Sequence, residues 1–155
     1  MNETKPNTLL RRSAPNTDRD IQPFWDNVAN RQLSVMRCKT CGAYYWPASY
    51  CRNHDNEPFL GNMEWVPASG KGTVFAFNVH HWAFDAALKE QVPYVYALIE
   101  LEEGPLIGSN VIDCDPSEVR VGLAVEVTFR EFAAADGDVF TLHQFVPAGT
   151  QSTAS

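Results

Sequence analysis

Four potential metal ligands stand close together near the start of the chain and constrain its fold more than any other feature. Cys38 and Cys41 are followed, after nine intervening residues, by Cys51 and His54, giving the spacing C-x2-C-x9-C-x2-H. Each pair can form a knuckle in which two ligands face one ion, and Gly42 permits the tight turn after the second sulfur. Two knuckles complete a tetrahedral site with no open position. The spacing therefore predicts a structural zinc that takes no part in catalysis.

Other interpretations of the same residues stay open. Asp55 or Glu57 could replace His54 as the fourth ligand, the site could be empty, or it could hold iron. The first two cysteines could also be a redox pair, although such a pair normally begins a helix in a βαβ unit, and the surrounding segments favour strands. Cys114 lies far downstream, and we expect it to be a small buried side chain rather than a ligand.

A short amphipathic helix is predicted before the cysteines. Asp20 can accept the free N–H groups of its first turn, and Pro23 lies early enough to spare an internal hydrogen bond. The helix either caps its own domain or packs on another subunit. Apolar side chains recur at the spacing of one helix face: Ile21, Phe24, Trp25, Val28 and Ala29.

From residue 33 onward the pattern favours strands. Three short segments surround the cysteines, and five longer ones, rich in Val, Phe, Tyr and Ile, follow at 72–82, 93–101, 105–113, 124–130 and 139–145. A turn at 102–105 joins the second and third of these. The segment between the third and fourth can form one helical turn, with Asp115 as its cap, Pro116 at its first position and Glu118 completing a capping box.

Five strands with a short helix between the third and fourth are typical of the OB-fold, a small Greek-key barrel. We therefore expect a mostly β protein, in which an N-terminal helix and a zinc ribbon precede a five-stranded OB-fold barrel. The predicted parts are a disordered tail at 1–19, an amphipathic helix at 20–32, a zinc ribbon at 33–62, the barrel at 63–147 and a second tail at 148–155.

Length and charge exclude several classes of protein. A chain of 155 residues is too short for a multidomain enzyme. With 12 basic and 19 acidic residues and no run of Lys or Arg, it lacks the positive surface that binds nucleic-acid phosphates. Its apolar runs are too short to span a membrane, and the N-terminus lacks the apolar core of a secretion signal. We expect a soluble, cytoplasmic protein.

Several motifs together resemble the DUF35 family, from about residue 21 to 147. They are Phe24-Trp25, RCKTCGAYYWPASYC, ASGKGTVFAFNVHH, the PYVYALIELEEGP hairpin and a closing Phe-x-Pro. The resemblance implies a rubredoxin-like zinc ribbon followed by an OB-fold. Family members usually carry a cysteine where this chain has His54, and imidazole is also an ordinary zinc ligand.

The resemblance also implies a partner. DUF35 proteins accompany thiolase-like (lipid-transfer-protein-like) subunits in complexes that make or break carbon–carbon bonds of acyl-CoA thioesters, as thiolases or as retro-aldolases that shorten steroid side chains. The expected role is a noncatalytic subunit, in a heterotetramer with two copies of each chain. Its edge of the coenzyme A channel would carry Lys71, Thr73 and Trp82.

The residues alone decide neither whether this chain forms an edge of the coenzyme A channel nor which function it has. The Ser69–Thr73 turn could cradle a phosphate or simply enter the first barrel strand, and Trp82, Phe84 and Tyr94 could stack an adenine or meet a partner. The histidines His80, His81 and His143 stand in no triad spacing. The alternative function is a free-standing OB-fold module for acyl-CoA or single-stranded nucleic acid, and the net charge of −7 opposes the nucleic acid.

Overall fold

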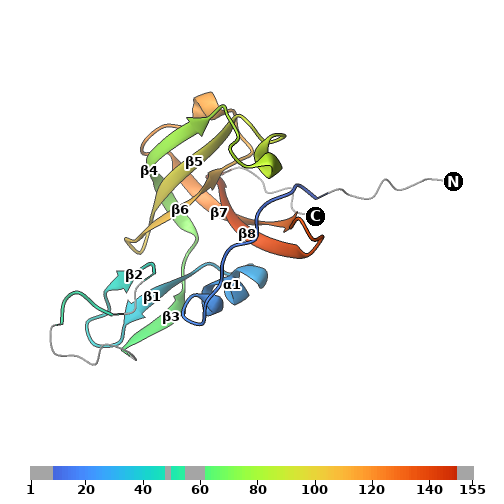
Figure 1. Ribbon diagram of the computed structural model, residues 1–155. Coiled ribbons are helices and arrows are strands. Elements are labelled where there is room, and N and C mark those ends of the chain that lie inside the picture. Colours follow the sequence, from blue (N-terminus) through green and yellow to red (C-terminus); the bar gives the residue numbers. More distant parts are fainter. Residues whose placement is uncertain (1–8, 48–49, 55–61, 150–155) are drawn as a thin grey trace.

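Two β modules and one α-helix make up the computed structural model, which describes residues 9–47, 50–54 and 62–149 (Figure 1). The barrel and the smaller sheet lie at opposite ends, and the helix lies in the angle between them. The elements are α1 (Gln22–Ala29), β1 (Ser34–Cys38), β2 (Tyr44–Tyr45), β3 (Met63–Pro67), β4 (Lys71–His80), η1 (Ala86–Leu88), β5 (Tyr94–Leu101), β6 (Leu106–Val111), η2 (Pro116–Glu118), β7 (Ala124–Ala133) and β8 (Val139–Pro147).

The five longer strands close into a barrel in the order β4-β5-β6-β8-β7. This order, with η2 between the third and fourth strands, confirms the predicted fold class. Residues of alternate positions fill the interior, and those of β5 alternate strictly between exposed and buried after Tyr94. The buried barrel core includes Val74, Val95, Ala97, Ile99, Leu101, Ile107, Val111, Val125 and Phe145.

The smaller sheet has the order β2-β1-β3. β3 pairs with β1 along its whole length, from Ser34 opposite Pro67 to Cys38 opposite Met63. The sequence places the start of the barrel at residue 63, whereas the structure gives β3 to the ribbon sheet and begins the barrel at Lys71. Pairing between strands so far apart in the chain has no local signal, which explains the difference.

Helix α1 packs within its own chain. Phe24 and Val28 are fully buried, and the Phe24 ring lies 5.2 Å from the Trp46 ring and 5.4 Å from the His143 ring, centroid to centroid. The helix therefore joins the ribbon to β8 of the barrel. The predicted cap Asp20 is wrong, because the side chain of Asp18 accepts the N–H groups ahead of the helix.

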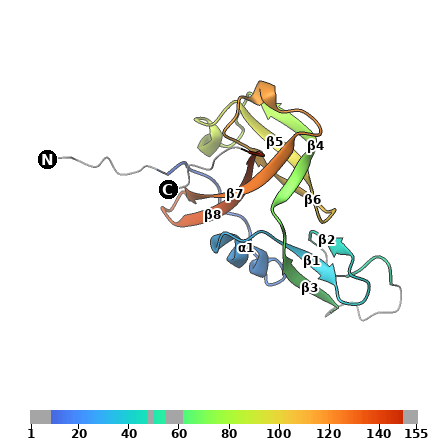
Figure 2. The ribbon, with the colours of Figure 1, turned by 180° about the vertical axis from the view of Figure 1, so that it is seen from behind.

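Two local predictions about the barrel are confirmed. The side chain of Asp115 accepts the Ser117 N–H, and Glu118 completes the capping box of η2. The turn between β5 and β6 lies at the predicted place and contains Gly104 with a φ of 113°. Figure 2 shows the other side of the barrel, where β7 lies between β4 and β8. No helix among the described residues is long and apolar enough to cross a membrane.

Candidate metal centre and partner surface

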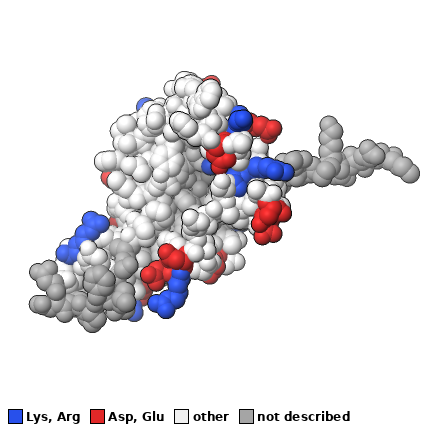
Figure 3. Space-filling view, in the orientation of Figure 1, with Lys and Arg blue, Asp and Glu red and all other residues white. Residues whose placement is uncertain are grey.

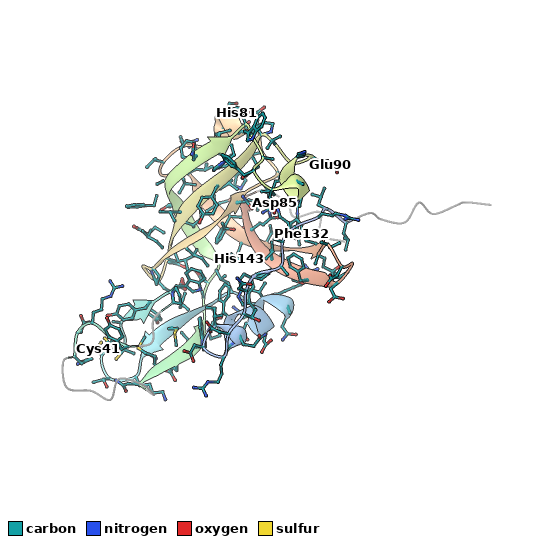
Figure 4. The ribbon with its side chains drawn as sticks, viewed as in Figure 1. Cys41, His81, Asp85, Glu90, Phe132 and His143 are labelled. Carbon is teal, nitrogen blue, oxygen red and sulfur yellow. The ribbon has the colours of Figure 1, made fainter. Side chains whose placement is uncertain are left out.

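The four predicted ligands meet at one point. Ligand atoms of Cys38, Cys41, Cys51 and His54 all lie within 4.8 Å of one another. Cys38 ends β1, and its carbonyl accepts the Gly42 N–H at 2.9 Å, which closes the first knuckle. The label of Cys41 in Figure 4 marks this end of the ribbon.

The sulfur spacing fits a tetrahedral zinc. Zinc–sulfur bonds of about 2.3 Å place ligand sulfurs about 3.8 Å apart, and the Sγ atoms of Cys41 and Cys51 are 3.6 Å apart. The Nε2 atom of His54 is buried and has no hydrogen-bond partner within the described part of the chain. An unpaired imidazole nitrogen beside three thiols is the donor set of a Cys3His site.

Hydrogen bonds favour the thiolate form that a metal requires at two of the three cysteines, whereas Cys51, despite its hydrogen bond with Tyr45, has a pKa raised by burial. The Ala43 backbone N–H and then the Asn53 side chain lower the pKa of Cys41 to about 7. The pKa of Cys38 is also lowered, chiefly by the backbone N–H of Cys41. These bonds reduce the electrostatic cost of gathering negative sulfurs around one point.

Asparagine side chains complete this environment, and the sequence analysis missed them. The Asn53 amide donates to Cys41 Sγ and the Asn62 amide to Cys38 Sγ, each at 3.6 Å. Asn53 could have been noticed, because it stands inside the second knuckle. Asn62 lies just before β3, 24 residues from Cys38, and gives no such signal. Asp55 and Glu57, the alternative ligands, lie outside the described residues. Cys114 is half-buried and packs beside the barrel core, outside the cluster.

Lys71 and Thr73 share a shallow cavity of about 300 Å³ at the start of β4. Glu100 and Glu102 line the same cavity, so its charge is mixed. The backbone N–H of Ser69, one of the donors expected in a phosphate cradle, already donates to the Glu103 carboxylate at 2.8 Å. A role for these residues toward coenzyme A stays a prediction.

Trp82 lies beyond the opposite end of β4. That strand has ten residues, so its two ends are separated by about 30 Å along the strand. Lys71 and Trp82 are thus not brought together. Trp82 and Phe84 are 74% and 92% exposed, in the loop before η1. This loop keeps two large aromatic side chains in solvent, whereas Tyr94, grouped with them in the sequence, is half-buried and stacked on His80.

The outer face of β4 and β5 is also apolar. Phe75, Tyr96 and Leu98 are exposed on these strands. Figure 3 shows this side of the barrel largely free of charged side chains. The Tyr96 side chain lies over Gly108 on β6, where an added Cβ would collide with the tyrosine hydroxyl. We call the exposed side chains Phe75, Trp82, Phe84, Tyr96 and Leu98 the aromatic face.

The three histidines outside the metal cluster occupy different places. The His80 ring stacks on Tyr94 with 4.8 Å between centroids, His81 is exposed beyond β4, and His143 is buried against α1 (Figure 4). Burial lowers the pKa of His143 to about 4, and its Nε2 atom lies 3.3 Å from the Gly108 carbonyl oxygen. Within the described residues, no histidine bonds to a carboxylate, a hydroxyl or a thiol.

Comparisons with known proteins agree with this architecture. Residues 65–130 match the family model for the C-terminal OB-fold domain of ChsH2. A DUF35 domain-containing scaffold protein of Methanocaldococcus jannaschii is 36% identical over 126 residues, which cover 78% of this chain and 84% of that protein. The chain belongs to the DUF35 family. The resemblance seen in the sequence is thereby confirmed.

Two further matches are to components of enzymes, a CoA hydratase and an aldolase. The DUF35 chain is 32% identical to the 3-oxo-4,17-pregnadiene-20-carboxyl-CoA hydratase alpha subunit of Mycobacterium tuberculosis, over 82% of its own length but only 38% of that protein's. A chain of the Ltp2-ChsH2(DUF35) aldolase superposes with a TM-score of 0.73 and 28% identity, covering 87% of this chain and 99% of that one. The ribbon and barrel architecture is thus shared with a component of a multi-subunit enzyme.

Proposed function

We propose that this DUF35 chain is a noncatalytic subunit that binds a thiolase-like subunit in a complex that makes or breaks carbon–carbon bonds of acyl-CoA thioesters. The matches to a scaffold protein and to a chain of an aldolase complex support this assignment. The histidines without catalytic neighbours support the noncatalytic part. The observation that carries the proposal is the aromatic face, because its exposed side chains need a partner.

The aromatic face has the composition of a protein interface. Trp82 and Phe84 are exposed on one loop, and Tyr96 and Leu98 are exposed on the neighbouring strand β5. Tryptophan and tyrosine are enriched among the residues that dominate binding energies, and contiguous exposed apolar patches mark interaction sites. Charged side chains, which are costly to bury, are scarce over β4 and β5 (Figure 3), whereas the loop that carries Trp82 and Phe84 continues into Asp85, Lys89 and Glu90. A protein surface of similar apolar character is the matching occupant.

The Cys3His cluster is proposed as a structural zinc site. Its three thiols and one imidazole would fill all four positions of a tetrahedral ion. Bound zinc would fix the two knuckles and hold the end of β1 against the loop that carries Cys51. The ion would contribute to folding and leave the chemistry to the partner subunit.

A minor role toward coenzyme A is proposed for Lys71 and Thr73, with Trp82 at a separate position. Because two glutamates share the cavity with Lys71, its electrostatic effect on a phosphate is small. We expect Lys71→Ala to raise the Michaelis constant of the complex for its CoA substrate measurably, by about two- to fivefold. An unchanged constant would remove this role without affecting the assembly.

Co-expression tests the proposed partnership. A thiolase-like subunit encoded beside this chain should copurify with it as a heterotetramer of two copies each. The double variant Trp82→Ala/Phe84→Ala should lose the complex while the free chain keeps its circular dichroism and melting temperature. Val121→Ala, which truncates a 67% exposed side chain outside the aromatic face, is the control and should leave the complex intact.

The result that would overturn the proposal is a monodisperse monomer that turns over an acyl-CoA substrate unaided. Binding of single-stranded oligonucleotides with a strong salt dependence would instead favour the free-standing OB-fold module. The net charge of −7 makes that module the weaker candidate.

A further inference from the structure

The N-terminal segment before α1 is bound to the barrel, although its composition is that of a tail. The Ala133 N–H donates to the Leu10 carbonyl at 3.0 Å, and the Arg12 N–H donates to the Ala133 carbonyl at 3.1 Å. Arg11 thereby forms a parallel bridge to the end of β7. Figure 1 shows this segment, in blue, passing the β7–β8 side of the barrel on its way to α1. We call residues 10–13 the strap.

Arg12 of the strap reaches the loop between β4 and β5. Its Nε and Nη2 atoms donate to Gln91 Oε1 at 3.1 and 3.0 Å. The Gln91 amide returns a bond to the Arg11 carbonyl at 3.0 Å, so the two segments are joined in both directions. The Arg12 guanidinium also lies 5.3 Å from the centroid of the Phe132 ring on β7. A planar guanidinium that donates two hydrogen bonds to the same oxygen and lies over an aromatic ring holds the Gln91 side chain in one orientation.

Ser13 holds the other end of the same loop segment. Its hydroxyl donates to Asp85 Oδ2 at 2.8 Å. The second oxygen of that carboxylate, Oδ1, accepts the Ala87 N–H at 2.9 Å and caps η1. Figure 4 labels Asp85 and Phe132 on the side of the barrel where the strap passes. The strap therefore holds the loop at residue 85 and again at residue 91.

The aromatic side chains of the loop stand directly before the first of these anchors. Phe84 precedes Asp85, and Trp82 is two residues further back. Neither aromatic side chain belongs to the buried core, so its own packing cannot fix the loop. The bonds from Arg12 and Ser13 are contacts that do restrict it.

We infer that the strap pre-organises the 82–91 loop, so that Trp82 and Phe84 are presented as a fixed wedge to an apolar hollow on the partner subunit. This inference rests on the proposed function. Binding a loop that is already ordered costs less entropy than binding a mobile one. Arg12 and Ser13 are thus positioning residues that act through Gln91 and Asp85 and need not touch the partner.

Hydrogen exchange and partner binding together test the inference. In the free chain, Arg12→Ala/Ser13→Ala and, separately, Gln91→Ala should speed amide exchange at Ala87, Leu88, Lys89 and Gln91 by about tenfold or more. The same variants should weaken binding to the thiolase-like subunit by about tenfold, mainly through faster dissociation. Arg11→Ala removes the same charge from an exposed neighbour and should change neither quantity.

The outcomes separate the strap from the proposed function. Unchanged exchange in both sets of variants would overturn the inference, and so would faster exchange with unchanged partner affinity. If the wild-type chain forms no complex at all, the proposed function fails, while the exchange data still report whether the strap orders the loop. If Trp82→Ala/Phe84→Ala binds normally, the wedge is contradicted but a partnership through another surface survives.

Discussion

The ribbon and the barrel are both small antiparallel β modules, yet they are held together in different ways. The barrel closes around a continuous apolar core, with Ile99, Ile107 and Phe145 fully buried. In the ribbon, two of the buried side chains are Cys38 and Cys51, which belong to the ligand cluster itself. A three-stranded sheet of this size buries too little apolar surface to fold by that means alone. Hydrophobic burial thus accounts for the barrel, whereas we expect the ribbon to depend in addition on a metal bound at the Cys3His cluster.

The largest effect should follow from breaking the metal cluster. In Cys41→Ser, the amides of β1, β2 and β3 should lose their protection from exchange, while those of β5 and β7 keep theirs, because metal binding supplies the folding free energy of such a module. Hydrogen exchange measures both modules at once. The control is Cys114→Ser, which removes a thiol outside the cluster. The purified wild type should contain one zinc per chain, and loss of protection across both modules would contradict the distinction.

The next largest effect should come from the joint between the modules. Phe24→Ala removes a fully buried ring that contacts side chains of both modules, and it should lower the free energy of unfolding by about 3–5 kcal/mol. Urea denaturation measures this loss. Gln22→Ala, on the exposed side of α1, is the matched control. A loss below about 1 kcal/mol would show that the helix contributes little to joining the modules.

Acid should weaken the same joint through His143. Burial holds its folded pKa at about 4, below the ordinary 6.5, so the unfolded chain takes up a proton first as the pH falls. The contribution of His143 to the free energy of unfolding is therefore fully present above pH 6.5. It is lost as the pH falls from 6.5 to 4, by about 2 kcal/mol at pH 5.

Denaturation at pH 7 and pH 5, compared between wild type and His143→Gln, isolates this contribution from acid release of zinc. The difference between the two proteins should shrink or reverse at pH 5, because only the wild type carries the histidine linkage. Equal pH dependence in both proteins would contradict the assignment.

The smallest effect is expected on the barrel surface. Arg130 on β7 donates to both carboxylate oxygens of Asp113, but both side chains are about 40% exposed. Arg130→Ala should therefore cost less than about 1 kcal/mol in thermal or urea unfolding. The barrel tolerates the loss of such a contact because burial of its apolar core is sufficient to keep it folded. A loss several times larger would show that it depends on surface ion pairs.

Short-range patterns allowed much of this structure to be predicted. The capping box at Asp115 and Glu118 and the meeting of the cysteines depend on spacings of a few residues, which the sequence displays directly. The strand order of the barrel could be predicted because the number of strands and the position of η2 leave few topologies.

Most of the features that sequence reasoning missed depend on long-range contacts; the Asp18 cap ahead of α1 is a local exception. Arg12 and Gln91 are 79 residues apart, and nothing in a polar N-terminal segment indicates which loop it will meet. The contact between the Asn62 amide and Cys38 joins residues 24 apart. The apolar stripe of α1 could not show whether the helix caps its own domain or packs on another subunit, and the structure has Trp25 packed against the core of its own chain.

In the function proposed above, this chain supports a thiolase-like partner and performs no chemistry of its own. The most direct measurement is the rate of carbon–carbon bond cleavage in an acyl-CoA substrate as this chain is titrated into the separately purified partner. We expect no turnover by this chain alone and a rate that rises to a plateau at one chain per partner chain. Turnover by the isolated chain, or a partner rate unaffected by its addition, would contradict the account.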